Sequence, residues 1–218
     1  MPKRALAEHR PWLLVSLAAA IAFYFLRDTP IGGIQLTLLK GAGVMALAVY
    51  AMQRTPVQDG LILALVMGLS ALGDMGIEFA FELGGAAFFF SHLAAIALYL
   101  RNRRQSTTGS QKALALVLLL SAPLVSWLLT QSWAVTLYGL ALGGMVSTAW
   151  MSRFPRYRVG SGAVLFLLSD WLIFSQESVL QDSSLPHWAI WPLYFGGQFL
   201  IATGVIQTLR GDLHEEQD

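Results

Sequence analysis

The chain has 218 residues, of which 56% are hydrophobic and 12% are charged, and its net charge is +1. That charged share is about half of what soluble domains carry, which is too little to cover a soluble surface of this size. The balanced charge gives no basis for nucleic-acid binding. Cysteine is absent, which excludes disulfides and thiolate metal sites, and the four histidines form no metal-binding motif. These features indicate an integral membrane protein without a metal site.

The N-terminus is basic and leads into an apolar run from Pro11 to Leu26. A basic segment followed by an apolar one also begins secretory signal peptides. However, no clear small-x-small cleavage site follows this run, which ends at Arg27-Asp28, and further hydrophobic segments come after it. We therefore expect a retained first helix.

Apolar segments long enough to span a membrane recur along the whole chain. A spanning helix needs about 20 apolar residues, and the breaks between the segments are short and carry turn residues or charge. The candidate spans are 11–27, 31–52, 58–79, 84–101, 111–130, 133–151, 159–176 and 187–209. The sequence thus predicts an all-α polytopic membrane protein with eight transmembrane helices, forming a single integral membrane domain over residues 1–218.

Basic residues are unevenly distributed among the loops, which predicts an orientation in the membrane. If the N-terminus is cytoplasmic, the cytoplasmic side receives Lys3, Arg4, Arg10, Arg54, Arg101, Arg103, Arg104, Lys112, Arg153, Arg156, Arg158 and Arg210. The opposite side receives only Arg27, while Lys40 lies within a predicted helix. This bias supports an even number of spans with both termini cytoplasmic. The expected location is the cell membrane or inner membrane of a bacterium.

Two stretches suggest an internal duplication. The third span contains Ser70-Ala-Leu-Gly-Asp74 and the seventh contains Phe166-Leu-Leu-Ser-Asp170. Each is followed by a loop and by a helix with an aromatic residue four positions before a polar one. Those pairs are Phe88 with His92, and Tyr194 with Gln198. Two four-helix repeats of this kind would be related by a pseudo-twofold axis along the membrane normal.

Five ionisable residues fall inside the predicted spans: Lys40, Asp74, Glu78, His92 and Asp170. An ionisable side chain is costly in lipid and usually faces a cavity or a partner. Asp74 and Asp170 occupy similar depths in the outer half of their helices, and the repeat would let them face each other. Desolvation and a nearby carboxylate both favour the neutral form of one acid. The result would be one protonated and one ionised carboxyl group, as general acid–base chemistry requires.

A structural role is the alternative for each of these groups. Either Asp can cap a neighbouring backbone or tie helices together. His92 follows Asp74 across a hairpin and can either approach that carboxylate or form an interhelical hydrogen bond. Lys40 can be the counter-ion of a buried Asp or bind a phosphate, and Glu78 reads as an interfacial carboxylate. Tyr194 and Gln198 share one helix face, where packing is the simpler interpretation.

The motifs also resemble a known family. The sequence is similar to the YhhN family of eight-helix membrane proteins, which includes the lysoplasmalogenases. The matching stretches are Leu72-Gly-Asp74, Phe81-x-x-Gly84 through Phe88 to His92-Leu93, Leu167-Leu-Ser-Asp170, and Tyr194-x-x-x-Gln198-x-x-Ile201-Ala202-x-Gly204. Two positions depart from the family pattern, since Gly41 follows Lys40 where the family has Pro, and Ala95 stands where a Tyr is common.

The resemblance implies hydrolysis of the vinyl-ether bond of a lysoplasmalogen, a lysophospholipid. The products would be a fatty aldehyde and a glycerophosphoethanolamine or glycerophosphocholine, and no metal or organic cofactor would be needed. One of Asp74 and Asp170 would donate the proton and the other would act as base or electrostatic partner. His92, Tyr194 and Gln198 would orient water or the acid, and Lys40 would hold the phosphate. Without the resemblance, a proton-coupled transporter or a lipid-binding membrane protein explains the buried charges equally well, and the oligomeric state stays open.

Overall fold

The computed structural model describes residues 11–30 and 32–215. The basic residues Lys3, Arg4 and Arg10 and the first residue of the second predicted span, Ile31, lie outside this part of the chain. The described residues are helical and contain no strand, apart from one isolated bridge between Arg103 and Ser152. The helices are α2 (Pro11–Leu26), α3 (Ile34–Arg54), α4 (Gln58–Ile77), α5 (Phe81–Arg101), α6 (Gly109–Thr130), α7 (Trp133–Met151), the π-helical turn η1 (Arg156–Gly160), α8 (Ser161–Ser175) and α9 (Leu185–Glu215).

Each predicted span corresponds to one helix, so the all-helical prediction is confirmed for the described residues. The boundaries differ most at α9, which has 31 residues and continues past Pro192 in its interior. A second difference precedes α8, where the first three residues of η1, 156–158, were expected to form a loop. The helix α4 ends at Ile77, so Glu78 caps its C-terminus instead of lying inside it.

Seven helical segments of the described chain are long and apolar enough to cross a membrane. The helix α2 is apolar but has only 16 residues. At 1.5 Å per residue it spans about 24 Å, which is less than the ~30 Å hydrocarbon core of a typical bilayer. The fold is therefore that of a multi-pass helical membrane protein.

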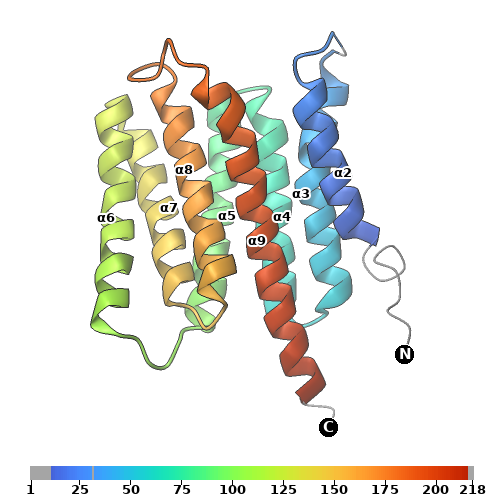
Figure 1. Cartoon of the computed structure of the whole chain (residues 1–218), viewed down its shortest axis with the longest axis vertical. Coiled ribbons are helices and arrows are strands. Elements are labelled where there is room, and N and C mark those ends of the chain that lie inside the picture. Colours follow the sequence, from blue (N-terminus) through green and yellow to red (C-terminus); the bar gives the residue numbers. More distant parts are fainter. Residues whose placement is uncertain (1–10, 31, 216–218) are drawn as a thin grey trace. The chain divides into compact units, whose positions relative to one another are not determined.

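The packing divides the chain into two parts, one ending at Ser91 and the other beginning at His92. The first part contains α2, α3, α4 and the first half of α5, with α2 packed on α3 and α3 on α4 (Figure 1). Ser16 joins α2 to α3 because its hydroxyl donates a hydrogen bond of 2.6 Å to the carbonyl of Gly43. Gly41 lies against α4, since a Cβ atom there would come within 2.7 Å of the Met75 side chain.

Small residues bring α4 close to the start of α5. A Cβ atom on Gly73 would come within 2.7 Å of the Phe88 ring, and one on Gly76 would come within 3.1 Å of Gly84. Close backbone approach through glycine is a common way to pack helices in membranes, where apolar burial between helices gives little driving force. The hydroxyls of Ser70 and Ser91 add an interhelical hydrogen bond of 2.9 Å.

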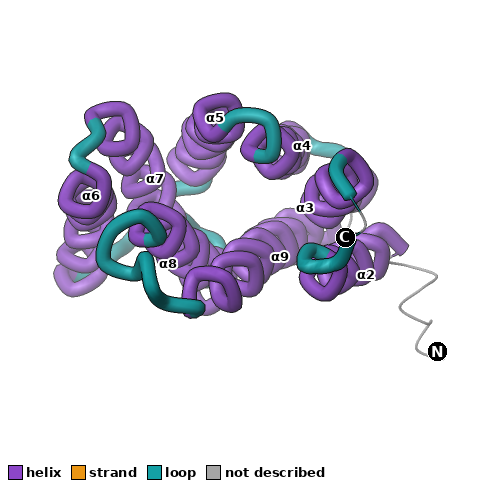
Figure 2. The backbone as a smooth tube through the Cα atoms, turned by 90° about the horizontal axis from the view of Figure 1, so that it is seen from above, coloured by secondary structure: helices purple, strands orange, loops and turns teal. Residues whose placement is uncertain are grey.

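The second part contains the other half of α5 with α6, α7, η1, α8 and α9 (Figure 2). The helix α7 packs on α6 and α8, and α8 packs on α9. Gly162 and Gly197 bring α8 and α9 together, because a Cβ atom on either would lie within 2.7 Å of the other's carbonyl oxygen. This close approach sets the relative height of the polar side chains on α8 and α9.

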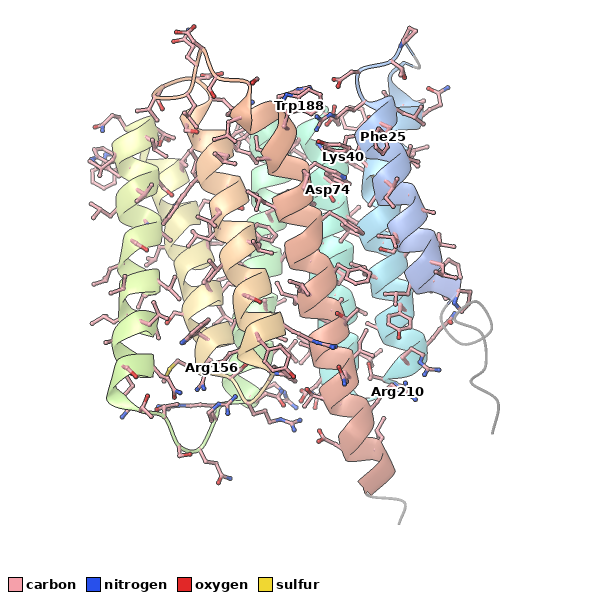
Figure 3. All side chains as sticks on the ribbon, in the orientation of Figure 1. Phe25, Lys40, Asp74, Arg156, Trp188 and Arg210 are labelled. Carbon is pink, nitrogen blue, oxygen red and sulfur yellow. The ribbon has the colours of Figure 1, made fainter. Side chains whose placement is uncertain are left out.

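Charged side chains gather at one end of the second part. Figure 3 shows Arg156 and Arg210 at the end opposite Trp188. At that end Arg153 donates to the side chain of Asn102 at 2.8 Å and pairs with Asp212 at 2.7 Å. The basic loops predicted to share one side of the membrane thus meet at one end within this part.

Candidate catalytic site

Three side chains of the second part form a chain of hydrogen bonds, which we call the relay. The Tyr138 hydroxyl donates to Asp170 Oδ2 at 2.6 Å, and His92 Nε2 lies 3.1 Å from the same hydroxyl. His92 and Asp170 are buried, with exposed fractions of 2% and 5%. Because the single hydroxyl hydrogen of Tyr138 points at the carboxylate, the oxygen of Tyr138 accepts a hydrogen bond from His92.

The relay draws one residue from each of three helices. His92 comes from the middle of α5, Tyr138 from the second turn of α7, and Asp170 from α8. Gly139, next to Tyr138, packs against Ser126 of α6, which sets the depth of α7. The Ser169 hydroxyl donates to the carbonyl oxygen of Phe166 at 2.7 Å, and its oxygen lies 3.5 Å from Asp170 Oδ1.

A row of rings connects the relay with α9. The Phe166 ring contacts the His92 ring edge-on at 5.1 Å between centroids and the Tyr194 ring at 5.2 Å. Edge-to-face contacts at these distances fix ring orientation. Tyr194 is thus positioned against the same phenylalanine as His92, and both rings are buried.

Gln198 lies one turn after Tyr194 on the same face of α9 and is 1% exposed. Within the described chain its Nε2 atom is a buried donor that has no hydrogen-bond partner. A buried donor without an acceptor costs about 1–3 kcal/mol, so each such group needs an explanation, of which a catalytic role is one. The amide can donate a hydrogen bond to a substrate oxygen or to water.

Asp74 belongs to the first part, in the last turns of α4, and is 2% exposed. It follows Ser70 by one helical turn, and the adjacent Gly73 packs against Phe88. The glycine contacts with α5 therefore determine where this carboxyl group lies. Asp74 is as buried as Asp170, as the charge pattern predicted.

Lys40 and Glu78 form an ion pair in the first part, with 2.6 Å between Nζ and Oε1. Their side chains are 15% and 43% exposed. Since α3 begins at Ile34, Lys40 lies in its second turn, nearer the helix end than the predicted span implied. Its carboxylate partner is Glu78 at the end of α4 instead of a buried Asp.

The structure thus brings the predicted residues together in two groups. Lys40 and Glu78 pair in the first part, one turn from Asp74; His92 and Asp170 are joined in the second, with Tyr194 on the same row of rings.

Tyr138 was missed by sequence reasoning, although it is the residue that joins His92 to Asp170. Tyrosine in a membrane protein is usually read as an interfacial residue. The available signal was depth: Trp133 already stands at the helix end, so Tyr138 in the second turn of α7 lies inside the span.

The model of the YhhN family matches residues 35–205. Two curated relatives, each named lysoplasmalogenase, come from Mycobacterium bovis and Mycobacterium tuberculosis and are 32% identical over 149 residues. That alignment covers 62% of this chain and 57% of each relative, so less than two thirds of the relatives' length is matched. No solved structure matches the chain.

The apolar helices and their buried acid, phenol and imidazole groups define a multi-pass membrane protein with polar groups held inside its bundle. The family match covers most of that bundle, including Lys40, Asp74, His92, Tyr138, Asp170, Tyr194 and Gln198. The chain belongs to the YhhN family.

Proposed function

We propose that the protein is a lysoplasmalogenase, an intramembrane hydrolase that cleaves the vinyl-ether bond of lysoplasmalogens. The observation that carries the proposal is the buried relay from His92 through Tyr138 to Asp170 in a chain of this family. The names of the mycobacterial relatives supply the substrate class. The buried carboxyl groups of Asp74 and Asp170 supply the acid–base chemistry.

The first step is proton transfer to carbon. A vinyl ether is protonated at the alkene carbon remote from oxygen, and the positive charge that develops is shared between the other alkene carbon and the ether oxygen. We assign this proton to Asp74. The ionised Asp170 would stabilise the oxocarbenium ion electrostatically, as a carboxylate does in glycoside hydrolysis.

The second step is addition of water. Asp170 accepts a hydrogen bond from the Tyr138 hydroxyl, as an ionised carboxylate does. It removes a proton from the attacking water, and a hemiacetal forms. The hemiacetal hydroxyl then loses its proton while the glycerol oxygen gains one and leaves, which releases the aldehyde and glycerophosphoethanolamine or glycerophosphocholine. The sum consumes one water and leaves Asp74 ionised and Asp170 protonated, and the cycle closes when Asp170 gives its proton up to water and Asp74 takes one up from water.

The relay has the form needed to hold a proton between these steps. If Asp170 gains a proton, it can donate to the Tyr138 oxygen. Tyr138 can then donate to His92 Nε2, provided that the imidazole proton moves from Nε2 to Nδ1. Tyr194 and Gln198 are assigned to orient water or the ether oxygen, with the unpaired Gln198 amide as donor. Lys40 is assigned to the substrate phosphate, next to Glu78.

We propose eight membrane crossings with both termini cytoplasmic, arranged as two four-helix repeats in a bacterial cell membrane. The short helix α2 would cross with local thinning of the bilayer. The gathering of basic residues at one end of the second part supports this orientation.

The decisive experiment uses the purified full chain in detergent with a lysoplasmalogen, and couples aldehyde release to an aldehyde dehydrogenase. Turnover without a membrane gradient is expected. Asp74→Asn and Asp170→Asn should each lose activity by about a hundredfold or more, and the double variant should lose little beyond either single variant because the two groups act in one sequence. Absence of turnover, combined with substrate-dependent flux in vesicles, would instead identify a transporter.

A further inference from the structure

The ion pair of Lys40 and Glu78, which we call the head-group pair, has a property that helix stability does not explain. Glu78 is the C-cap of α4, and no basic residue occupies the last turn of that helix. The C-terminal end of a helix carries partial negative charge and disfavours a carboxylate. A partly exposed ion pair contributes little to stability. Placing Glu78 here therefore concentrates negative charge at a point where folding alone would favour a cation.

The side chains of Lys40 and Glu78 also differ in how far they are exposed. The Glu78 side chain is 43% exposed and the Lys40 side chain 15% exposed, and Lys40 Nζ lies 5.9 Å from the centre of the Phe23 ring. The ammonium group is held between α2, α3 and α4, while the carboxylate is open on one side. A ligand can reach both members of the pair, with its cationic end at the more open carboxylate.

The position of the pair relative to Asp74 sets the direction of a bound lipid. Asp74 and Glu78 lie four residues apart, and so on one face of α4. One helical turn rises about 5.4 Å, a length comparable to the glycerol backbone between the phosphate and the vinyl ether of a lysoplasmalogen. Figure 3 shows Lys40 and Asp74 near the same end of the first part.

We infer that the head-group pair is a recognition site for a zwitterionic phosphoethanolamine head group, in which Lys40 binds the phosphate and Glu78 binds the terminal ammonium. This inference rests on the proposed function, because it places the reactive bond at Asp74. The ligand replaces one internal ion pair by two, so no charge is left unbalanced. The ammonium of ethanolamine donates hydrogen bonds to a carboxylate, whereas the quaternary group of choline is held by charge alone. The expected order of affinity is ethanolamine, then choline, then a head group with a bare phosphate.

The test measures binding separately from catalysis. The probes are acyl lysophospholipids, which carry an ester in place of the vinyl ether, with ethanolamine, choline or no group on the phosphate. Each competes with radiolabelled lysophosphatidylethanolamine for the purified full chain in detergent. Glu78→Gln should weaken binding of the ethanolamine lipid by about tenfold, the effect of one charge-assisted hydrogen bond, and leave the bare-phosphate lipid unaffected or bound more tightly. Lys40→Met should weaken all three.

If the pair has only a structural role, a variant that keeps an ion pair at these positions should keep wild-type head-group selectivity. The exchanged variant K40E/E78K keeps an ion pair between α3 and α4 but reverses its direction. Restored wild-type selectivity in that variant would overturn the inference, and so would wild-type selectivity in Glu78→Gln. If a single variant cannot be purified, the exchanged variant still decides between the two roles. Asp212→Asn is the matched control, because it breaks the Arg153–Asp212 ion pair and should leave selectivity unchanged.

Aldehyde release measured on the same preparations separates this inference from the proposed function. A wild-type chain that binds the ethanolamine lipid selectively but releases no aldehyde would overturn the hydrolase proposal and support the head-group site. A wild-type chain that releases aldehyde, with unchanged selectivity in Glu78→Gln, would overturn the head-group site alone.

Discussion

The hydroxyl group of Tyr138 donates a hydrogen bond of 2.6 Å to Oδ2 of Asp170. The bond crosses from α7 to α8 and gives a buried carboxylate a partner that is itself bonded to an imidazole. A carboxylate isolated in an apolar bundle would be costly. The hydroxyl donor from Tyr138, itself bonded to His92, offsets part of that cost. In the proposed mechanism it also lets Asp170 accept and release a proton.

Replacement of Tyr138 by phenylalanine should therefore lower kcat by about a hundredfold while changing KM little. Phenylalanine keeps the volume of the ring and its contact with Phe174, so the loss comes from the hydroxyl alone. The measurement is aldehyde release at saturating and limiting lysoplasmalogen. Tyr99→Phe removes another buried tyrosine hydroxyl in the same part of the chain and should leave kcat unchanged. A loss confined to KM would argue against proton transfer through Tyr138.

A second prediction concerns the buried amide of Gln198. Leucine in its place removes an unpaired donor, which costs about 1–3 kcal/mol when buried, so the unfolding temperature in detergent should stay the same or rise. Activity should fall at least about tenfold, because the donor assigned to the substrate or water is gone. Trp150→Phe removes another buried donor that lacks a partner in the described chain, and should leave activity as it is. Full activity in Gln198→Leu would remove Gln198 from the site.

Most of the helical architecture was predictable, because segments of about 20 apolar residues separated by charge or turn residues have few other interpretations. The differences arise where hydropathy carries no information. Residues 156–160 form a π-helical turn, and α9 continues beyond its last apolar turn. Neither feature changes the apolar count of a span. Lys40 lies inside its helix as expected, but nearer the helix end, because α3 begins at Ile34, after Gly33 with a φ of 58°, and not at residue 31.

The site was predictable only as a set of anomalous residues. Asp74, His92 and Asp170 stand out because ionisable groups are costly in apolar helices. Gln198 is indicated only by the repeat and by the family resemblance, and all four residues are buried. Their partners were not predictable, since a hydrogen bond between helices depends on rotation and depth that a single sequence does not encode. Tyr138 shows this most clearly, because tyrosine is common in membrane proteins and only its contact with Asp170 gives it a role.

The contact between α8 and α9 supplies a third prediction with a neighbouring control. A Cβ atom on Gly197 would lie 2.6 Å from the carbonyl oxygen of Gly162, whereas one on Gly196 would meet nothing within 4 Å. Gly197→Ala should therefore destabilise the protein by about 1–3 kcal/mol and lower activity, because it separates the helices that carry Tyr194 and Asp170. Gly196→Ala should be neutral in both respects. The readouts are thermal unfolding in detergent and aldehyde release. Equal effects of the two substitutions would contradict this account of the interface.

The proposed orientation gives a fourth prediction, which the absence of cysteine makes simple to test. Asp182 lies in the exposed segment between α8 and α9, and Gln105 lies in the exposed segment between α5 and α6. With cytoplasmic termini and eight crossings, these segments are on opposite sides of the membrane. A membrane-impermeant maleimide added to intact cells should label Asp182→Cys and not Gln105→Cys, and both should be labelled after the cells are broken.

The two positions are separated by an odd number of crossings, α6, α7 and α8. Labelling of both in intact cells would therefore contradict the helix count, and the reverse pattern would contradict the orientation. The reverse pattern would also place the head-group pair and Asp74 toward the cytoplasm, so the same measurement determines from which leaflet a lysophospholipid would have to enter.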